Sequence, residues 1–277
     1  MQKKQITLIF LIFVLIACSP AVPAPEQPSV ETIVAGTLQA LTASAPIPTE
    51  VNGISFIDDN ISFVIPTGIA TSATEEIVEE SLPAADMPWW ATYPQYHTYN
   101  LAGYVLTDTF HKADIYIYPI AEYVAMNEDV GKNIETLKSL IANPNQALPE
   151  RLPFLPTFNA GQMFYANFGT ATFQNGSGIR YITEFSQFPH PITNNGMFYT
   201  FQGITNDGLY YVSAVFPINV DFLVGYPTPT DQGDFAFIES EVIRVTEQLN
   251  NTSSDSFTPR LSALDTLIQS INVTGLP

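Results

Sequence analysis

From residue 51 onward, apolar and polar residues alternate over short stretches that turn residues separate. This alternation is typical of β-strands that bury one or both faces. Two hairpins are predicted most clearly, because Asn-Gly and Asp-Gly pairs accept the positive φ that tight hairpin turns need. They join residues 163–173 to 179–185 around Asn175-Gly176-Ser177-Gly178, and residues 197–204 to 209–216 around Asn206-Asp207-Gly208. Further strands are expected at residues 54–56, 61–65, 96–106 and 114–118.

In other stretches the apolar residues recur at helical spacing. Residues 127–142 are predicted to form a helix with Asn127 as its N-cap. The same spacing predicts a helix over residues 234–249 and a last helix that begins at Thr258-Pro259, a cap followed by proline. Residues 71–81 are also expected to be helical, with a solvated face formed by Glu75, Glu76, Glu79 and Glu80.

Local hairpins with helices before and after them indicate an α+β fold, an antiparallel sheet of about 6–8 strands with helices packed on it. Over residues 51–250 this order of elements resembles the PsbP-like αβα sandwich of many secreted or lipid-anchored bacterial proteins. The stretch Phe198-Tyr199-Thr200-Phe201-Gln202-Gly203, which leads to Tyr210-Tyr211-Val212, also resembles a group of bacterial lipoproteins with no assigned activity. Neither resemblance supplies catalytic residues, and a fold alone does not define a function.

The amino-terminal residues follow a different pattern. Lys3 and Lys4 precede an apolar run over residues 6–16, which is typical of a secretion signal and too short to span a bilayer of ~30 Å as a helix. The residues Leu15-Ile16-Ala17-Cys18 resemble a bacterial lipobox, and Cys18 is the only cysteine of the chain. The resemblance implies a lipoprotein signal peptide at residues 1–17 and acylation of Cys18, with palmitate among the chains. The alternative is an ordinary signal peptide with an incidental Cys18.

Residues 18–50 are predicted to form a proline-rich tether, in which residues 30–41 could form a short helix. Residues 51–277 then form a single α+β domain. Two or three acyl chains on Cys18 would hold the protein on a membrane stably, because each buried methylene adds ~0.8 kcal/mol. We therefore expect a lipid-anchored protein of the cell membrane that faces outside the cytoplasm.

The net charge of the chain limits the classes of partner that it can bind. Nine Lys and Arg residues stand against 27 Asp and Glu residues, a formal charge of −18. Without residues 1–17, which include two lysines and no acidic residue, seven basic residues remain and the charge is −20. Such a surface repels nucleic-acid phosphates and anionic lipid head groups, which argues against both as partners. With Cys18 bound to lipid, no disulfide can form within the mature chain, so the domain must fold on its core alone.

Few residues are available for a metal site or a catalytic centre. The three histidines, His97, His111 and His190, lack the short spacing of zinc ligands, and His190 between two prolines is interpreted as a loop residue. Three acidic clusters lie at residues 58–60, 206–208 and 231–234. They are better explained as turns or helix caps than as calcium-binding loops. The chain has no Gly-x-Ser-x-Gly motif. No cofactor is therefore predicted.

One cluster of rings is a stronger candidate for binding a ligand or partner. It precedes a predicted strand and consists of Trp89, Trp90, Tyr93, Tyr96, His97 and Tyr99. Aromatic rings with polar edges stack on sugars and anchor protein interfaces. The alternative is that these rings fill a satellite core at a sheet edge.

These observations favour a non-catalytic binding or adaptor protein that recognises an envelope protein or glycan. The alternative function is a hydrolase of envelope glycans or lipids, in which His97 or His111 works with an acidic partner that the sequence does not reveal. A third hypothesis is a structural spacer without any partner. An open pocket where a histidine meets a carboxylate or serine would support the hydrolase, whereas packed rings and scattered surface histidines would support the binding protein.

Overall fold

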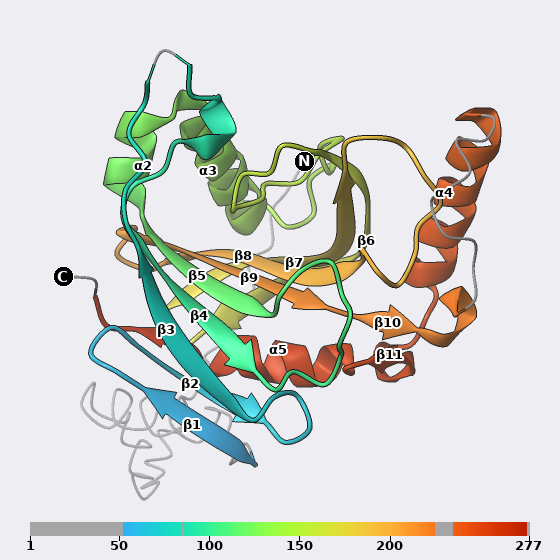
Figure 1. Ribbon diagram of the computed structural model, residues 1–277, viewed down its shortest axis with the longest axis horizontal. Coiled ribbons are helices and arrows are strands. Elements are labelled where there is room, and N and C mark those ends of the chain that lie inside the picture. Colours follow the sequence, from blue (N-terminus) through green and yellow to red (C-terminus); the bar gives the residue numbers. More distant parts are fainter. Residues whose placement is uncertain (1–51, 85, 225–234, 276–277) are drawn as a thin grey trace, which may run out of the picture. The chain divides into compact units, whose positions relative to one another are not determined.

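A seven-stranded antiparallel sheet forms the centre of the computed structural model, which describes residues 52–84, 86–224 and 235–275 (Figure 1). In spatial order the strands are β3 (Ser72–Val78), β4 (Tyr96–Ala102), β5 (Asp114–Pro119), β9 (Tyr210–Pro217), β8 (Phe198–Thr205), β7 (Gly176–Ser186) and β6 (Gly161–Phe173). The helices of the described part are α2 (Ile120–Met126), α3 (Glu128–Ala142), α4 (Phe235–Asn250) and α5 (Leu261–Ser270). The predicted α+β class is confirmed.

Smaller elements complete the fold. A three-stranded sheet contains β1 (Gly53–Ile57), β2 (Ile61–Pro66) and β12 (Asn272–Val273), and a two-stranded one contains β10 (Asn219–Val220) and β11 (Phe257–Thr258). The 3-10 turns are η1 (Trp89–Ala91), η2 (Asp221–Leu223) and η3 (Ser254–Ser256). Residues 51–277 form one compact unit. The predicted signal peptide, Cys18 and the predicted tether lie outside the described residues.

Helices cover both faces of the central sheet. Side chains alternate between the two faces along each strand, and both faces carry apolar side chains that need cover. In β9, Tyr211 packs in an apolar cluster with α2 and α3, whereas Val212 and Ala214 pack in another with α4, α5 and β2. In Figure 1 α2 and α3 lie above the sheet and α5 below it. Burial on both sides explains why all eight residues of β8 are buried.

The predicted hairpins are confirmed. β6 pairs with β7, and β8 pairs with β9. The first turn consists of Gln174 and Asn175, since β7 begins at Gly176 rather than at residue 179. In the second turn Gly208 has a φ of 74°, and Asp207 Oδ1 accepts a hydrogen bond from the Leu209 amide at 3.0 Å. The amino-terminal hairpin β1–β2 also forms where the alternation predicts it.

The helix predicted over residues 71–81 is wrong, because residues 72–78 form strand β3. β3 pairs with β4 along its whole length, from Ser72 opposite Ala102 to Val78 opposite Tyr96. The backbone hydrogen bonds of this pairing outweigh the weak helix propensity that four glutamates confer. Glu75 and Glu76 consequently lie on opposite faces of the sheet instead of on one solvated helix face.

Of the remaining helices, α3 and α4 match the predictions, α5 begins later than predicted, and α2 was not predicted. α3 occupies the predicted range, and α4 ends one residue beyond it; Asp234, its predicted first residue, lies outside the described residues. The short helix α2 has no counterpart among the predicted elements. α5 begins at Leu261 with Arg260 as N-cap, not at Thr258-Pro259. That start was wrong because Thr258 pairs with Asn219 in the small β10–β11 sheet.

Asn127 caps α3, as predicted, and also makes a hydrogen bond to the η1 turn. Its Oδ1 accepts hydrogen bonds from the backbone amides of Asp129 at 3.1 Å and Val130 at 3.3 Å. Its Nδ2 donates to the Trp89 carbonyl at 2.9 Å. One buried side chain therefore joins the start of α3 to the η1 turn.

We expect Asn127→Ala to lower the free energy of unfolding by about 1–2 kcal/mol, because a cap and an anchoring bond are lost together. Urea denaturation measures this loss. The control is Asn143→Ala at the exposed carboxyl end of the same helix, where less than about 0.5 kcal/mol is expected. Equal losses for the two variants would contradict the capping role.

A buried network holds the irregular connection between α3 and β6 against the sheet. Gln202 Oε1 in β8 accepts hydrogen bonds from the Leu155 amide at 2.9 Å and from the Tyr211 hydroxyl at 2.7 Å. Gln202 Nε2 donates back to the Leu155 carbonyl at 3.1 Å. From α3, Asn133 Nδ2 donates to the Phe154 carbonyl at 2.8 Å. This connection continues into residues 158–160, whose position therefore depends on the network.

The two edge strands of the sheet are protected differently. β3 carries Glu75 and Glu76, and two further glutamates follow it directly. β6 contacts α4 at a bulge, where the Asn167 amide donates to Asn250 Oδ1 at 2.7 Å and Asn167 Nδ2 donates to the Leu249 carbonyl at 2.7 Å. One edge is thus acidic and the other is covered by a helix.

Candidate functional site

The predicted aromatic cluster does not form one patch, because its residues lie in three places. Trp89 and Trp90 belong to η1, and Trp89 is 54% exposed. Tyr93 and Tyr96 pack edge to face, 5.5 Å apart, in the apolar cluster that α2 and α3 cover. His97 and Tyr99 are buried, and Tyr99 packs in the cluster on the opposite face of the sheet.

His97 meets a carboxylate, but in a structural link between strands. Its Nδ1 lies 2.6 Å from Glu75 Oε1, and the same oxygen accepts from the Tyr99 hydroxyl at 3.3 Å and from Asn60 Nδ2 at 3.4 Å. The His97 hydrogen bond is the largest cause that lowers the pKa of Glu75. All these donors engage one carboxylate oxygen, so the group ties β3 to β4 and to the β1–β2 turn.

A cavity of about 640 Å³ lies at the end of the sheet. β7 continues beyond its last pair with β8, Thr183 opposite Phe198, so its final residues pair with β6 alone. Glu184 and Ser186 therefore border open space, and the loop between β7 and β8 adds His190 to the wall. We refer to this space as the end cavity.

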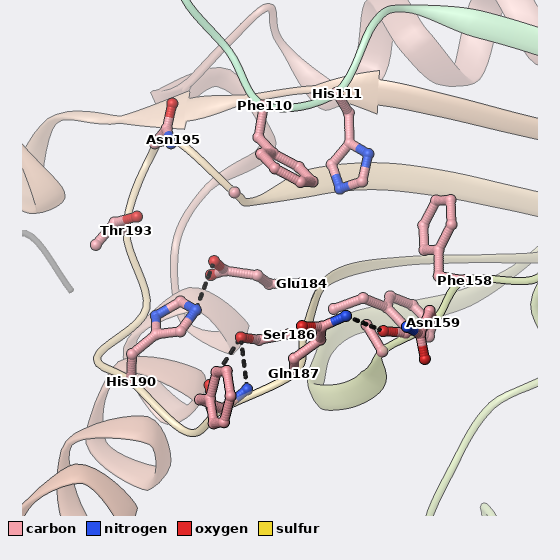
Figure 2. A pocket seen from close by; sticks show the side chains of 14 residues that line it. Phe110, His111, Phe158, Asn159, Glu184, Ser186, Gln187, His190, Thr193 and Asn195 are labelled. Atoms are coloured by element: carbon pink, nitrogen blue, oxygen red, sulfur yellow. Dashed lines mark hydrogen bonds and ion pairs between the residues drawn. The ribbon is translucent and has the colours of Figure 1, made fainter. Parts of the chain in front are cut away.

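Two other connections close the end cavity. The β4–β5 loop contributes Phe110 and His111, and the connection before β6 contributes Phe158. Figure 2 shows Phe110 and His111 across the cavity from Glu184 and His190. The Phe110 amide donates to the Asn195 carbonyl at 3.0 Å, which joins the β4–β5 loop to the β7–β8 loop.

Glu184 is the buried acidic group of the end cavity. Its residue is 3% exposed, and its Oε2 has no hydrogen-bond partner among the described residues. Gly196 lies so close that a Cβ there would collide with the carboxyl group. Burial raises the pKa of Glu184 to about 8, although the Thr193 amide opposes this shift. At pH 7 the side chain therefore carries its proton and can donate a hydrogen bond into the cavity.

His190 is placed to exchange that proton. Its Nε2 lies 3.4 Å from Glu184 Oε1, and its Nδ1 lies 2.9 Å from the Pro191 carbonyl. A carbonyl oxygen only accepts, so Nδ1 must carry the hydrogen. In the neutral ring Nε2 then has its lone pair free and can accept from the protonated Glu184.

His111 supplies a second polar atom without a partner. Its ring stacks on Phe158 at 5.2 Å and meets Phe198 edge to face at 4.6 Å. Burial lowers the pKa of His111 to about 4, so the ring is neutral at pH 7. Of the four buried side-chain atoms without partners in the described part of the chain, two belong to residues that line the end cavity: His111 Nε2 and Glu184 Oε2. Such atoms are rare and indicate a place where a ligand or water binds.

Exposed rings and amides form the rim of the end cavity. Phe110 is 74% exposed and Phe188 is 71% exposed. Gln187 Nε2 donates to the Asn159 carbonyl at 3.0 Å. Among the described lining residues, Glu184 is the only Asp, Glu, Lys or Arg. The cavity thus combines apolar rings with uncharged polar groups.

The arrangement limits the chemistry that the described residues offer. Ser186 Oγ donates to the Phe188 carbonyl at 2.7 Å and not to a histidine, so no base activates it as a nucleophile. Glu184 could act as a general acid because it carries a proton at neutral pH. No group of three or more His, Cys, Asp or Glu residues that could hold a metal ion occurs in the described ranges. None of the helices in those ranges is long and apolar enough to cross a membrane.

The chain matches no known protein-family model, and none of the curated proteins compared with it matches either. The candidate site therefore rests on its geometry.

Sequence reasoning selected neither Glu184 nor the rim rings Phe110 and Phe188, and it interpreted His190 as an ordinary loop residue. One signal was available. Glu184 is a lone acidic residue inside an alternating apolar strand, and a residue of that type is costly to bury without a purpose. Glu184 and His190 come from the end of β7 and the loop that follows it, whereas His111 comes from the distant β4–β5 loop, and no local pattern relates that loop to β7.

Proposed function

We propose that this protein is a lipid-anchored, extracytoplasmic binding protein that holds a glycan of the cell envelope in the end cavity. One observation carries the proposal: exposed phenylalanine rings and buried polar atoms without partners share one cavity. Ligand sites are typically concave and largely apolar, with a few polar groups that orient the ligand.

The chemistry of the cavity suits a sugar better than a charged ligand. A sugar ring has an apolar C–H face, which can lie against Phe110 or Phe188, and a rim of hydroxyl groups. The protonated Glu184 and the neutral His111 can each hydrogen-bond a hydroxyl. An anion in the same place would lose its hydration without gaining a positive partner.

The membrane location is supported by sequence. The lipobox-like residues Leu15-Ile16-Ala17-Cys18 follow a secretion-type segment, and the formal charge of the processed chain excludes attraction to anionic lipids as the means of attachment. Intact-mass analysis of the purified protein is expected to show residues 1–17 removed and fatty acids added at Cys18. An unprocessed or unacylated amino terminus would contradict this part of the proposal.

The binding proposal predicts that Phe110→Ala combined with Phe188→Ala weakens glycan affinity at least about 10-fold, since two stacking faces are lost. The full-length chain in detergent is presented to an array of envelope polysaccharides and peptidoglycan fragments, and affinities for the glycans that bind are measured by calorimetry. Both rings are mostly exposed, so the variant should fold normally.

Phe235→Ala is the matched control, because Phe235 on α4 is also 74% exposed and does not line the cavity. It should bind as the wild type does. If no glycan binds to the wild type, or if the double variant binds as strongly as the control, the proposal fails. If an envelope protein, and no glycan, is captured through Phe110 and Phe188, the ligand of the cavity is a protein and the glycan proposal is wrong.

A hydrolase remains the second candidate function, and the contact of His190 with Glu184 in an open cavity favours it. A lone carboxylic acid with a raised pKa can protonate the leaving oxygen of a glycosidic bond. Glu184→Gln separates the two functions, because glutamine keeps the size and a hydrogen-bond donor but cannot transfer a proton. Shortened glycans released by the wild type and not by the variant would establish a hydrolase. Equal binding by both proteins with no product would establish a binding protein.

A further inference from the structure

A second hollow of about 360 Å³ adjoins the end cavity. The two share Phe158, Ala160 and Phe185 in their linings, so they lie next to each other on the surface. The second hollow lies between α3 and the connection before β6, and we refer to it as the side hollow. Its lining includes Trp89 and Arg151.

The turn that carries Trp89 is fixed in place beside the side hollow. The Trp89 carbonyl accepts from Asn127 Nδ2 at 2.9 Å, and the Trp90 carbonyl accepts from Thr157 Oγ1 at 2.7 Å. The indole is nevertheless 54% exposed. A large ring on a fixed backbone turn that is left open to solvent is suited to stacking, because the turn need not be ordered when a ligand covers the ring.

The charge of the side hollow differs from that of the end cavity. Two of the chain's nine basic residues, Lys132 and Arg151, line it. Lys132 Nζ is neutralised by Glu128 and Asp129, each at 3.0 Å. Arg151 is exposed and forms no ion pair with any described residue. In a chain with a formal charge of −18, a free guanidinium in the same hollow as an exposed tryptophan marks a place for an anionic group.

We infer that the two hollows form one extended site for an acidic oligosaccharide, with an uncharged sugar in the end cavity and a carboxylate-bearing sugar between Trp89 and Arg151. This inference rests on the proposed function and deepens it. It predicts that the protein binds a chain of at least two sugar units more tightly than a single sugar. Of the predicted aromatic cluster, Trp89 has a binding role in this site, whereas Tyr93, Tyr96, His97 and Tyr99 have none.

The test compares two probes of equal length. One is a hexasaccharide that alternates glucuronate with N-acetylglucosamine, and the other is the neutral N-acetylglucosamine hexamer. The full-length wild-type protein is expected to bind the acidic probe about 10-fold more tightly, which is the effect of one charge-assisted hydrogen-bonded pair. Arg151→Gln should remove this preference, so that the variant binds the two probes with equal affinity.

Arg260→Gln is the matched control, because Arg260 is also exposed but does not line either hollow. It should keep the preference, which separates a local contact from the general effect of removing one positive charge. A Trp90→Phe variant leaves Trp89 as the only tryptophan. Its fluorescence should change when the acidic hexasaccharide binds.

The outcomes are distinct. If both probes bind equally and Arg151→Gln has no effect, while Phe110→Ala with Phe188→Ala still weakens binding, the extended site is wrong and the end cavity stands alone. If Arg260→Gln removes the preference as well, the effect is long-range and the inference also fails. If neither probe nor any array glycan binds the wild type, the proposed function itself fails.

Discussion

Replacing Gln202 with alanine is expected to lower the free energy of unfolding by about 4 kcal/mol or more. Gln202 is fully buried. Its Oε1 accepts from the Leu155 amide and the Tyr211 hydroxyl, and the two N–H groups of Nε2 are shared among the Leu155 carbonyl and the hydroxyls of Thr200 and Ser213. Alanine would leave the Tyr211 hydroxyl and the Leu155 amide buried without partners, at a cost of roughly 1–3 kcal/mol each, and would open a cavity.

Urea denaturation followed by circular dichroism measures the loss. Gln95→Ala is the control, because Gln95 is exposed and its change should stay within about 0.5 kcal/mol. Glycan binding should weaken together with stability, since Gln202 holds the connection that carries Phe158 into the end cavity. A loss below about 1 kcal/mol would show that the network is not the main support of this connection.

Glu184→Gln is expected to have an effect on stability that depends on pH. Burial holds the pKa of Glu184 at about 8, above its ordinary value of 4.5. Between these values the folded state binds more protons than the unfolded state, so the wild type loses stability as the pH rises from about 4.5 to 8. Glutamine carries no charge, so the variant should be more stable than the wild type at pH 8 by a few kcal/mol and nearly equal to it at pH 4.5.

Denaturation midpoints at pH 4.5 and pH 8 measure the difference. His190 lies 3.4 Å from Glu184 and His111 faces it across the cavity (Figure 2); attraction to a protonated His190 would reduce the effect. Glu79→Gln, at an exposed position beyond β3, is the control and should behave as the wild type does at both pH values. A constant difference between Glu184→Gln and the wild type at both pH values would contradict the raised pKa.

Local chemistry explains which parts of the fold could be predicted. The β6–β7 and β8–β9 hairpins depend on turns such as Asp207-Gly208, whose residues accept the required backbone angles. The start of α3 depends on Asn127, whose side chain caps the amides that follow it. In both cases the determining residues lie within a few positions of the element, so the sequence pattern contains the information.

Distant pairing explains the errors. β3 forms because it pairs with β4, and no residue between 71 and 81 indicates that this pairing occurs. The start of α5 is displaced because Thr258 pairs with Asn219, which lies far away in the sequence. In each case a tertiary contact outweighs the local preference that the prediction used.

The candidate site was missed for the same reason. The predicted cluster treats neighbours in sequence as neighbours in space, but β4 sends Tyr96 to one face of the sheet and Tyr99 to the other. The end cavity instead brings together Glu184 from strand β7 with His111 and Phe158 from two separate connections. Only the lone carboxylate of an otherwise largely apolar stretch, Tyr181 to Phe185, could have drawn attention to it.

The contrast between the two edges of the sheet has a consequence for copies of this protein that meet one another. An edge strand presents unpaired backbone groups to which a neighbouring molecule could add a strand. Along β3, repulsion between the glutamates of two approaching molecules opposes such self-association, and along β6 the helix α4 blocks it. Neutralising the carboxylates beside β3, by acid or by substitution, should therefore be the route by which this domain begins to aggregate.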